Sequence, residues 1–361
     1  MEEKITGNKG EWSEIYTLFK LLGDGRVYAG DADMNKMNLY YPILNVIRRE
    51  AKKYEYEPKT DKRIIIIKED GQKIAEIPVQ RFVDEAKNLL TEIKTAKGDG
   101  AYEIPSAEAF MQEVKCTKLK APSKDKADIH IVIHDTRTGM TPELGFSIKS
   151  QLGSASTLLN AGMTTNVRFR IRGIQDAQVI ENINAISAHR DRMAAIYENN
   201  GSLKYDSIKN ETFRNNLMFI DCCLPLFVGE CLRLQNTPEA ETSVKVIVEQ
   251  VAEENPFHYE GANRSAFYEH KMKKLLIASA LGMTPATAWN GRYDANGGYL
   301  VVRKDGEIVC YHFYNMNDVE DYLYNNTRFE CASRSRYNFG YLYIENDKCY
   351  IDLNLQIRFK K

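Results

Sequence analysis

Apolar residues recur at helical spacing near the start of the chain. Steps of three and four residues separate the apolar positions from Trp12 to Leu22, which predicts an amphipathic helix over residues 9–22. On a helical wheel Glu11 lies beside the apolar stripe, whereas Glu14 points further round towards solvent. An acid at the border of a buried face is unusual, so Glu11 is the acid that this helix is expected to turn inward.

The pattern then changes to a period of two, which predicts strands between residues 26 and 82. The runs RIIII and KIAEIPV are joined by Glu69-Asp70-Gly71, a turn sequence that predicts a hairpin. Helical spacing returns over residues 84–97 and 106–115, with a glycine-rich break between them.

Two further strands follow. Asp128 opens the apolar run of residues 129–133, and a segment with turn residues leads to a second strand at residues 145–150. Side chains alternate across a strand, so Phe146 and Ile148 share the face directed at the core. The other face carries the polar positions Glu143, Ser147, Lys149 and Gln151.

The rest of the chain divides by composition. Residues 167–172 are a third strand candidate, residues 174–282 are strongly helical, and residues 213–234 read as one kinked core helix. Two hairpins are expected after residue 284. We therefore predict an α/β (α+β) fold with a mixed sheet and three segments, which form one joined body or two domains. The first segment, residues 1–173, contains the N-terminal helix and a β-rich insertion. Residues 174–283 form a helical segment, and residues 284–361 form a β-rich segment.

Composition limits the class of protein. The 361 residues carry a formal net charge of −1, which argues against coating nucleic acid indiscriminately but permits a basic groove. No apolar run reaches membrane-spanning length and the N-terminus lacks a signal peptide, so a cytoplasmic protein is expected. The seven cysteines include no CxxC pair and are expected to be reduced and buried.

The strand pair resembles a known nuclease site. An aspartate at the head of one strand, followed about twenty residues later by an x-x-Lys strand, is similar to the active site of the PD-(D/E)XK nucleases. The strings ELGFSIKSQLGSASTLLNAGMTTN and ITGNKGEWSEIY resemble, more specifically, the HpaII-type type II restriction endonucleases. This resemblance implies a restriction-endonuclease-like core whose mixed sheet is flanked by helices. It also implies Mg²⁺-dependent cleavage of double-stranded DNA at CCGG that leaves 5′-phosphates, with a DNA methyltransferase that protects the same site.

The chemistry assigns roles to the strand residues. Hydrolysis of a phosphodiester needs a hard cation with carboxylate ligands, and Asp128 is the first ligand expected. Lys149 at the rim of the sheet can reach a phosphate and the attacking water; by resemblance it orients or activates that water. The motif usually has an acid two residues before the lysine, and here that position is Ser147, whose hydroxyl supplies no charge.

Three residues could compensate for the missing acid: Glu11, Glu143 and Gln151. Glu143 shares the face of Lys149, but it lies about 20 Å away along a straight strand. Gln151 is close enough to orient water or phosphate, although an amide brings no charge. Glu11 is therefore preferred to Glu143 as the second metal ligand.

Candidate DNA contacts lie outside the strand pair. Alternation places Arg168, Arg170 and Arg172 on one strand face, and arginine is the commonest reader of guanine. Ser154 and Ser156, in a loop, could bind phosphate. A later turn offers three more polar side chains, namely Arg334, Arg336 and Asn338. The arginine clusters could instead be solvated faces, and the serine loop could be an ordinary flexible connection.

Other functions remain open at this stage. The chain could be a repair or nicking nuclease of the same fold, or a DNA-binding protein on a catalytically decayed core, as Ser147 suggests. Asp128 and Lys149 could also form an ordinary ion pair in an unrelated α/β protein. A palindromic target favours a two-fold homodimer, although the sequence does not decide between monomer and dimer.

Overall fold

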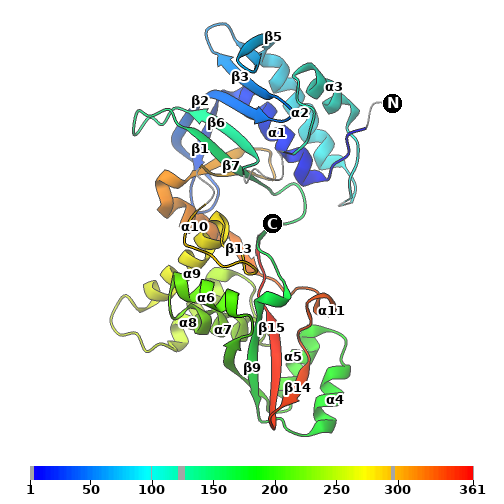
Figure 1. Cartoon of the computed structure of the whole chain (residues 1–361), viewed down its shortest axis with the longest axis vertical. Coiled ribbons are helices and arrows are strands. Elements are labelled where there is room, and N and C mark those ends of the chain that lie inside the picture. The colour runs from blue at the N-terminus through cyan, green and yellow to red at the C-terminus, as the bar shows by residue number, and fades with distance from the viewer. Residues whose placement is uncertain (1–3, 99, 121–126, 294–296, 361) are drawn as a thin grey trace. The chain divides into compact units, whose positions relative to one another are not determined.

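The structure, a computed structural model, describes residues 4–98, 100–120, 127–293 and 297–360. The chain forms two compact units, and each is built from two separate stretches (Figure 1). The first unit contains residues 1–156 and 294–322, and the second contains residues 157–293 and 323–360. The units thus divide the chain differently from the three segments expected from composition, because residues 157–173 group with the helical part and residues 294–322 with the N-terminal part.

The first unit consists of a large sheet and its covering helices. Its helices are α1 (Lys9–Asp24), α2 (Val79–Thr95), α3 (Pro105–Glu113) and the first part of α10 (Met316–Asn326). Its strands are β1 (Arg26–Gly30), β2 (Lys36–Arg49), β3 (Lys53–Lys59), β4 (Ile64–Glu69), β5 (Gln72–Pro78), β6 (Ile129–Ile133), β7 (Glu143–Ser150), β11 (Gly298–Val302) and β12 (Ile308–His312).

The described strands of this unit form one mixed sheet in the order β1-β12-β11-β7-β6-β2-β3-β4-β5. An additional pairing of β1 with β2 closes the strands between them into a ring. Within it, β7 runs antiparallel to β6 and parallel to β11. The strand predicted to carry the lysine therefore has a hydrogen-bonded neighbour on both sides.

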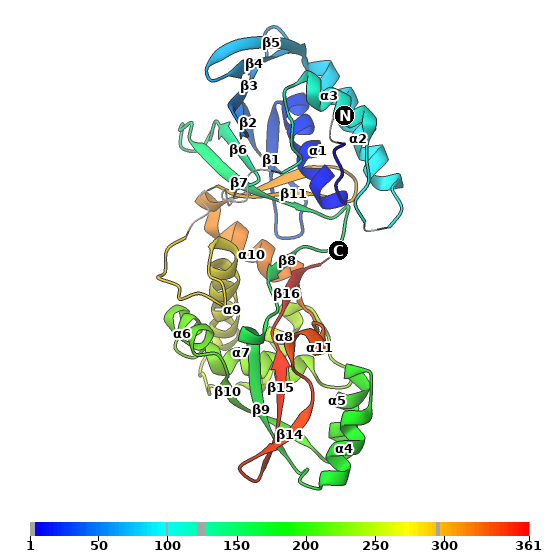
Figure 2. The same cartoon turned by 45° about the vertical axis from the view of Figure 1, so that its right-hand side comes forward.

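Helix α1 holds this unit together because it is buried on most of its circumference. Trp12 and Phe19 are completely inaccessible to solvent. Phe19 meets Phe110 of α3 edge to face at 4.9 Å between ring centroids, and Phe82 of α2 meets Phe110 at 5.1 Å. These aromatic contacts fix α1 against α2 and α3, which lie beside it in both views (Figures 1 and 2).

The second unit combines helices with two smaller sheets. Its helices are α4 (Ala177–Ala185), α5 (His189–Glu198), α6 (Glu211–Ile220), α7 (Leu224–Gln235), α8 (Val244–Glu254), α9 (Arg264–Leu281), the end of α10 and α11 (Arg334–Tyr337). Its strands are β8 (Thr157–Leu159), β9 (Asn166–Arg172), β10 (Ser202–Ile208), β13 (Thr327–Phe329), β14 (Leu342–Glu345), β15 (Lys348–Asn354) and β16 (Ile357–Phe359). The described strands pair in the orders β10-β9-β15-β14 and β13-β16-β8.

Most of the predicted elements are confirmed. The mixed α/β class, the N-terminal helix, the β4–β5 hairpin, the β6–β7 pair and the two late hairpins are all present. The single kinked helix over residues 213–234 is wrong: α6 and α7 are separate, with Asp221–Cys223 between them. The helical segment also contains a strand, β10, and the third strand β9 lies in the second unit's sheet. No helix in the described part of the chain is long and apolar enough to cross a membrane.

Candidate active site

The β6–β7 ladder places the predicted acid and lysine on neighbouring strands. Ile129 pairs with Phe146, and the backbone N–H of Asp128 donates to the Phe146 carbonyl at 2.9 Å. On the other side of β7, Lys149 pairs with Val301 of β11. Backbone hydrogen bonds on both sides of β7 therefore fix where these side chains start.

A chain of hydrogen bonds joins Asp128, Ser147 and Lys149. The Lys149 ammonium donates to the Ser147 hydroxyl at 3.0 Å, and that hydroxyl donates to Asp128 Oδ2 at 3.1 Å. The same carboxylate oxygen accepts the backbone N–H of Ile148 at 2.6 Å. Ser147, which stands in the place of the motif acid, thus links the acid to the lysine and fixes their orientation without adding charge.

Lys149 lies in an enclosed environment. Burial lowers the pKa of its ammonium, while the charges of Asp128 and Glu14 act in the opposite direction. The Tyr299 ring lies beneath the ammonium, with the nitrogen 5.5 Å from the ring centroid, a distance at which the ring face attracts a cation. The charge of Asp128 and the face of the Tyr299 ring therefore stabilise the lysine ammonium, and Glu14 adds to this when it is ionised.

Glu14, which was expected to face solvent, is turned into this site. Its Oε2 atom is buried and has no hydrogen-bond partner. Burial, followed by the charge of Asp128, raises the pKa of Glu14 to about 8. The predicted orientation is wrong because α1 is covered on more of its circumference than a single apolar stripe implies: Ser13 and Thr17 are buried as well.

Glu11, the acid preferred from the sequence, has other partners. It completes a capping box with Asn8, whose backbone N–H donates to Glu11 Oε2 at 2.7 Å. Its other carboxylate oxygen pairs with Lys120. The N-x-x-E spacing before an apolar run is a known cap signature, so the sequence did contain a signal that Glu11 would be used at the helix start.

The other two compensating residues lie apart from the acid–lysine chain. Glu143 is exposed at the start of β7 and pairs with Arg49 at 2.5 Å. Gln151 follows the end of β7; its backbone N–H donates to Val302 at 2.9 Å and its amide nitrogen is 3.5 Å from the Met34 sulfur. The partners of Glu143 and Gln151 are thus residues other than Asp128 and Lys149, so the geometry favours Glu14 as the second acid.

The predicted DNA contacts belong to both units. Ser154, exposed, and Ser156, half-buried, follow β7 in the first unit. The arginines of β9 and the residues near α11 belong to the second unit. Arg334 donates to the Ser187 carbonyl, Arg336 is exposed, and Asn338 adopts the left-handed conformation (φ 49°).

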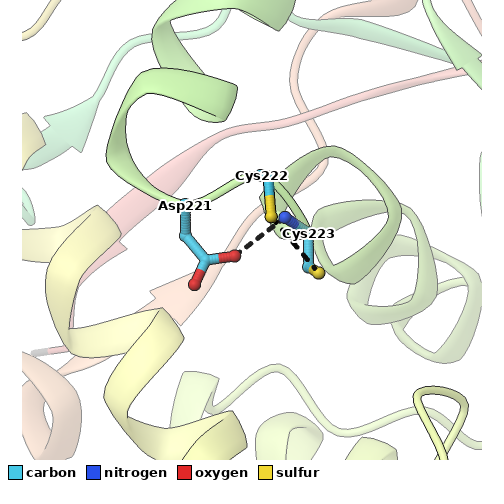
Figure 3. A group of neighbouring side chains, drawn as sticks. All are labelled: Asp221, Cys222 and Cys223. Atoms are coloured by element: carbon cyan, nitrogen blue, oxygen red, sulfur yellow. Dashed lines mark hydrogen bonds between the residues drawn. The ribbon is translucent and has the colours of Figure 1, made fainter.

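A different group of possible metal ligands lies between α6 and α7 in the second unit (Figure 3). The ligand atoms of Asp221, Cys222 and Cys223 are within 4.8 Å of one another. However, Asp221 already accepts the Lys271 ammonium at 2.6 Å and the Cys223 backbone N–H at 2.8 Å, so a cation there would meet a positive charge. Cys222 and Cys331 are exposed, which contradicts the expectation that all the cysteines are buried.

The first unit's site brings together two acids, a lysine and a serine at the end of a strand pair. Carboxylates can hold a metal ion and a lysine can bind a phosphate, so this set is chemically able to assist phosphodiester hydrolysis. The model of the HpaII restriction endonuclease family matches residues 8–359, and the chain belongs to that family. It is 45% identical, over 99% of its length and 100% of the relative's, to the type II restriction enzyme HpaII of Haemophilus parainfluenzae.

No solved structure matches the chain. Membership of the family nevertheless makes the protein a type II restriction enzyme homologue, a site-specific endonuclease whose class acts on double-stranded DNA.

Proposed function

We propose that the protein is a Mg²⁺-dependent type II restriction endonuclease that cuts double-stranded DNA at CCGG and leaves 5′-phosphates. The observation that carries this proposal is the hydrogen-bonded chain from Lys149 through Ser147 to Asp128, with the unpaired oxygen of Glu14 facing the same site. The 45% identity to HpaII over 99% of the chain supports the target.

The proposal includes a PD-(D/E)XK core. The antiparallel β6–β7 pair within a mixed sheet, the adjacent helix α1 and the spacing of Asp128 from Lys149 support it. The departure from the motif lies at Ser147. In our proposal Glu14 supplies from α1 the charge that an acid at this strand position would bring.

The available oxygen atoms fit a hard divalent cation. Asp128 and Glu14 are carboxylates, the ligands that Mg²⁺ prefers, and Glu14 Oε2 is buried without a partner. Such an orphaned oxygen is costly unless something binds it. In this proposal Asp128 and Glu14 hold the ion, and Glu11 and Glu143 retain their ion pairs with Lys120 and Arg49.

When bound, Mg²⁺ would neutralise phosphate oxygens and lower the pKa of an attacking water. Lys149 places a positive charge beside the scissile phosphate and donates hydrogen bonds to its oxygens or to the water. Ser147 holds Lys149 and Asp128 in register through its hydroxyl. Gln151, two residues further on, is left to orient water or phosphate.

Two partners follow from a palindromic target. A two-fold homodimer would give one active site for each DNA strand. A DNA methyltransferase that modifies the same sequence would protect the host's own DNA.

Cleavage of a plasmid that contains CCGG sites tests the proposal. We expect discrete fragments in Mg²⁺, none in EDTA, and none from Asp128→Ala or Lys149→Ala; mapping the fragment ends gives the target. A wild type that binds this DNA but never cuts it would support the decayed-nuclease alternative. Normal cutting by both variants would place the active site elsewhere.

A further inference from the structure

The β10-β9-β15-β14 sheet of the second unit has two different faces. On one face the inward residues of β9, such as Phe169 and Ile171, are buried. Close packing covers this face, since a side chain at Gly229 of α7 would come within 2.2 Å of the Tyr205 ring. The strand register places Arg170 opposite both Tyr350 and Lys204 on the other face, which therefore carries the polar residues.

This polar face is predominantly basic. Alternation along β9, β10 and β15, with Lys209 just after β10, gathers six cations. They are Arg168, Arg170, Arg172, Lys204, Lys209 and Lys348. Glu345 and Asp352 are the acids that the pairing of β14 and β15 adds to the same face. A cationic sheet face with tyrosines complements the phosphate backbone of DNA.

One arginine and one aspartate are fixed side by side on this face. Arg168 and Asp352 are cross-strand partners, with Arg168 Nε 4.0 Å from Asp352 Oδ1. Asp352 is only 5% exposed. It accepts the Lys209 ammonium at 2.7 Å and the Tyr343 hydroxyl at 2.9 Å, so its carboxylate is rigidly held.

A hollow reaches the aspartate of this pair. Asp352, Lys209 and Tyr343 help to line a hollow of about 310 Å³, which is large enough for the edge of a base. Arg168 Nε is buried without a hydrogen-bond partner, and the guanidinium lies over the Tyr350 ring at 5.1 Å. The carboxylate acceptor thus lines the recess, and the guanidinium of Arg168 lies next to it, with Nε 4.0 Å from Asp352 Oδ1.

The chemistry of this pair matches one base pair. In the major groove guanine presents two acceptors, O6 and N7, and cytosine presents the N4 amino donor. An arginine fork satisfies the guanine acceptors, and a carboxylate accepts from the cytosine amino group. In an A·T pair adenine presents one acceptor, N7, beside an amino donor that would face the fork, and thymine presents the O4 acceptor, which repels a carboxylate, and a methyl group.

We propose that this basic face lies against the target duplex and that Arg168 and Asp352 read one of its G·C pairs, while Arg170, Arg172, Lys204 and Lys348 contact phosphates. This inference rests on the proposed function, because it takes CCGG duplex DNA as the ligand.

Fluorescence anisotropy with short duplexes tests the inference. All chains carry Lys149→Ala so that Mg²⁺ can be present without cleavage. The measured quantity is the ratio of the affinity for a CCGG duplex to that for duplexes in which single G·C pairs are replaced by A·T. We expect Asp352→Asn and Arg168→Lys to lower this ratio about tenfold for the replacement of one G·C pair and of its equivalent in the other half of the palindrome. The affinity for DNA without the site should stay nearly unchanged.

Two control variants separate the roles. Glu345→Gln removes the exposed acid that pairs with Arg168 at 2.6 Å and should leave the ratio unchanged. Arg172→Gln should weaken binding to all duplexes alike and reduce the slope of affinity against salt. Thermal denaturation of each variant checks that the ratio is compared between folded chains.

The possible failures are distinguishable. If the Lys149→Ala chain itself shows no preference for CCGG, the proposed target is wrong and the inference falls with it. If that chain discriminates and folded Asp352→Asn and Arg168→Lys discriminate equally well, the proposed target stands and the Arg168–Asp352 pair is only a structural ion pair.

Discussion

We expect Glu14 to determine how the candidate site responds to pH. Its pKa of about 8 means that the carboxyl group is mostly protonated at neutral pH, and a metal ligand must lose that proton. Below pH 8, we expect the apparent dissociation constant for Mg²⁺ to fall roughly tenfold for each unit by which the pH is raised. Glu14→Gln should bind Mg²⁺ weakly at every pH, as calorimetry would show. A pH dependence equal to that of the wild type would exclude Glu14 as a ligand.

The same residue should influence stability in the absence of metal. Because the pKa in the folded protein is raised above the ordinary value of 4.5 to about 8, the folded state holds a proton that the unfolded chain has released. This contribution is complete below pH 4.5 and is lost as the pH rises through 8. The Tm of Glu14→Gln, measured in EDTA between pH 5 and pH 9, should therefore fall less than that of the wild type.

The role of Ser147 can be tested by removing the acid at Glu14 on α1 and introducing an acid at Ser147 on β7. The hydroxyl of Ser147 lies between Asp128 and Lys149, at the position where the proposed PD-(D/E)XK motif would have a carboxylate. We expect Glu14→Gln to lower the cleavage rate about 100-fold or more, because a lost metal ligand costs several kcal/mol. Adding Ser147→Asp to Glu14→Gln should restore part of that rate. Ser147→Ala in the same background is the matched control and should restore none.

At the residue scale the sequence predicted the acid–lysine pair but not its second acid. Asp128 and Lys149 could be found because strand alternation and spacing are local. Glu14 could not, because its orientation depends on α2 and on the sheet, which cover α1 from different sides. The helical wheel favoured Glu11 as the second metal ligand, but its carboxylate is used in the capping box with Asn8.

At the scale of elements, the active strand β7 depends on a close approach by the start of β11. A side chain at Gly297 would place its Cβ 2.3 Å from the carbonyl oxygen of Gly145, and backbone cannot yield as a flexible side chain does. We expect Gly297→Ala to separate the strands, lowering the free energy of unfolding by about 1–3 kcal/mol and reducing cleavage. Gly100→Ala, where a Cβ meets nothing within 4 Å, is the control for the loss of a glycine.

Denaturant unfolding and cleavage rates, measured on both glycine variants, check this. Equal behaviour of the two would mean that β11 is not needed to hold β7. The sequence predicted both strands, and the β11–β12 hairpin with its tip, because turn residues and alternation are local signals. It could not predict that β11 pairs with β7, since about 150 residues separate Gly298 from Phe146.

Contacts between segments far apart in sequence also explain why the sheet of β9 and the break within residues 213–234 were not predicted. The period of β9 identified a strand, but its partners β10 and β15 lie far apart in sequence, so its sheet could not be assigned. Residues 213–234 read as one apolar helix. The break follows from Asp221, whose carboxylate accepts from the Cys223 N–H and from Lys271. A side chain that holds a turn between two helices is harder to recognise than a proline or a glycine.

At the scale of the whole molecule, each chain carries one Asp128 and one Lys149, and a palindrome has two strands to cut. We therefore expect two chains on one CCGG duplex. Sedimentation of the Lys149→Ala chain with increasing amounts of a single-site duplex would measure this. A stable complex of one chain with one duplex, together with nicked plasmid as a cleavage intermediate, would instead indicate sequential cutting by a monomer.

The arrangement of the two units along the chain has a consequence for synthesis. Ribosomes make β6 and β7 early, but β11 and β12, which complete the ring of strands around them, emerge only after most of the second unit. Until then the strand with Lys149 has an open edge where Val301 should pair with it. A chain that ends before β11 therefore lacks two strands of the unit that carries Asp128 and Lys149, and we expect it not to cut DNA.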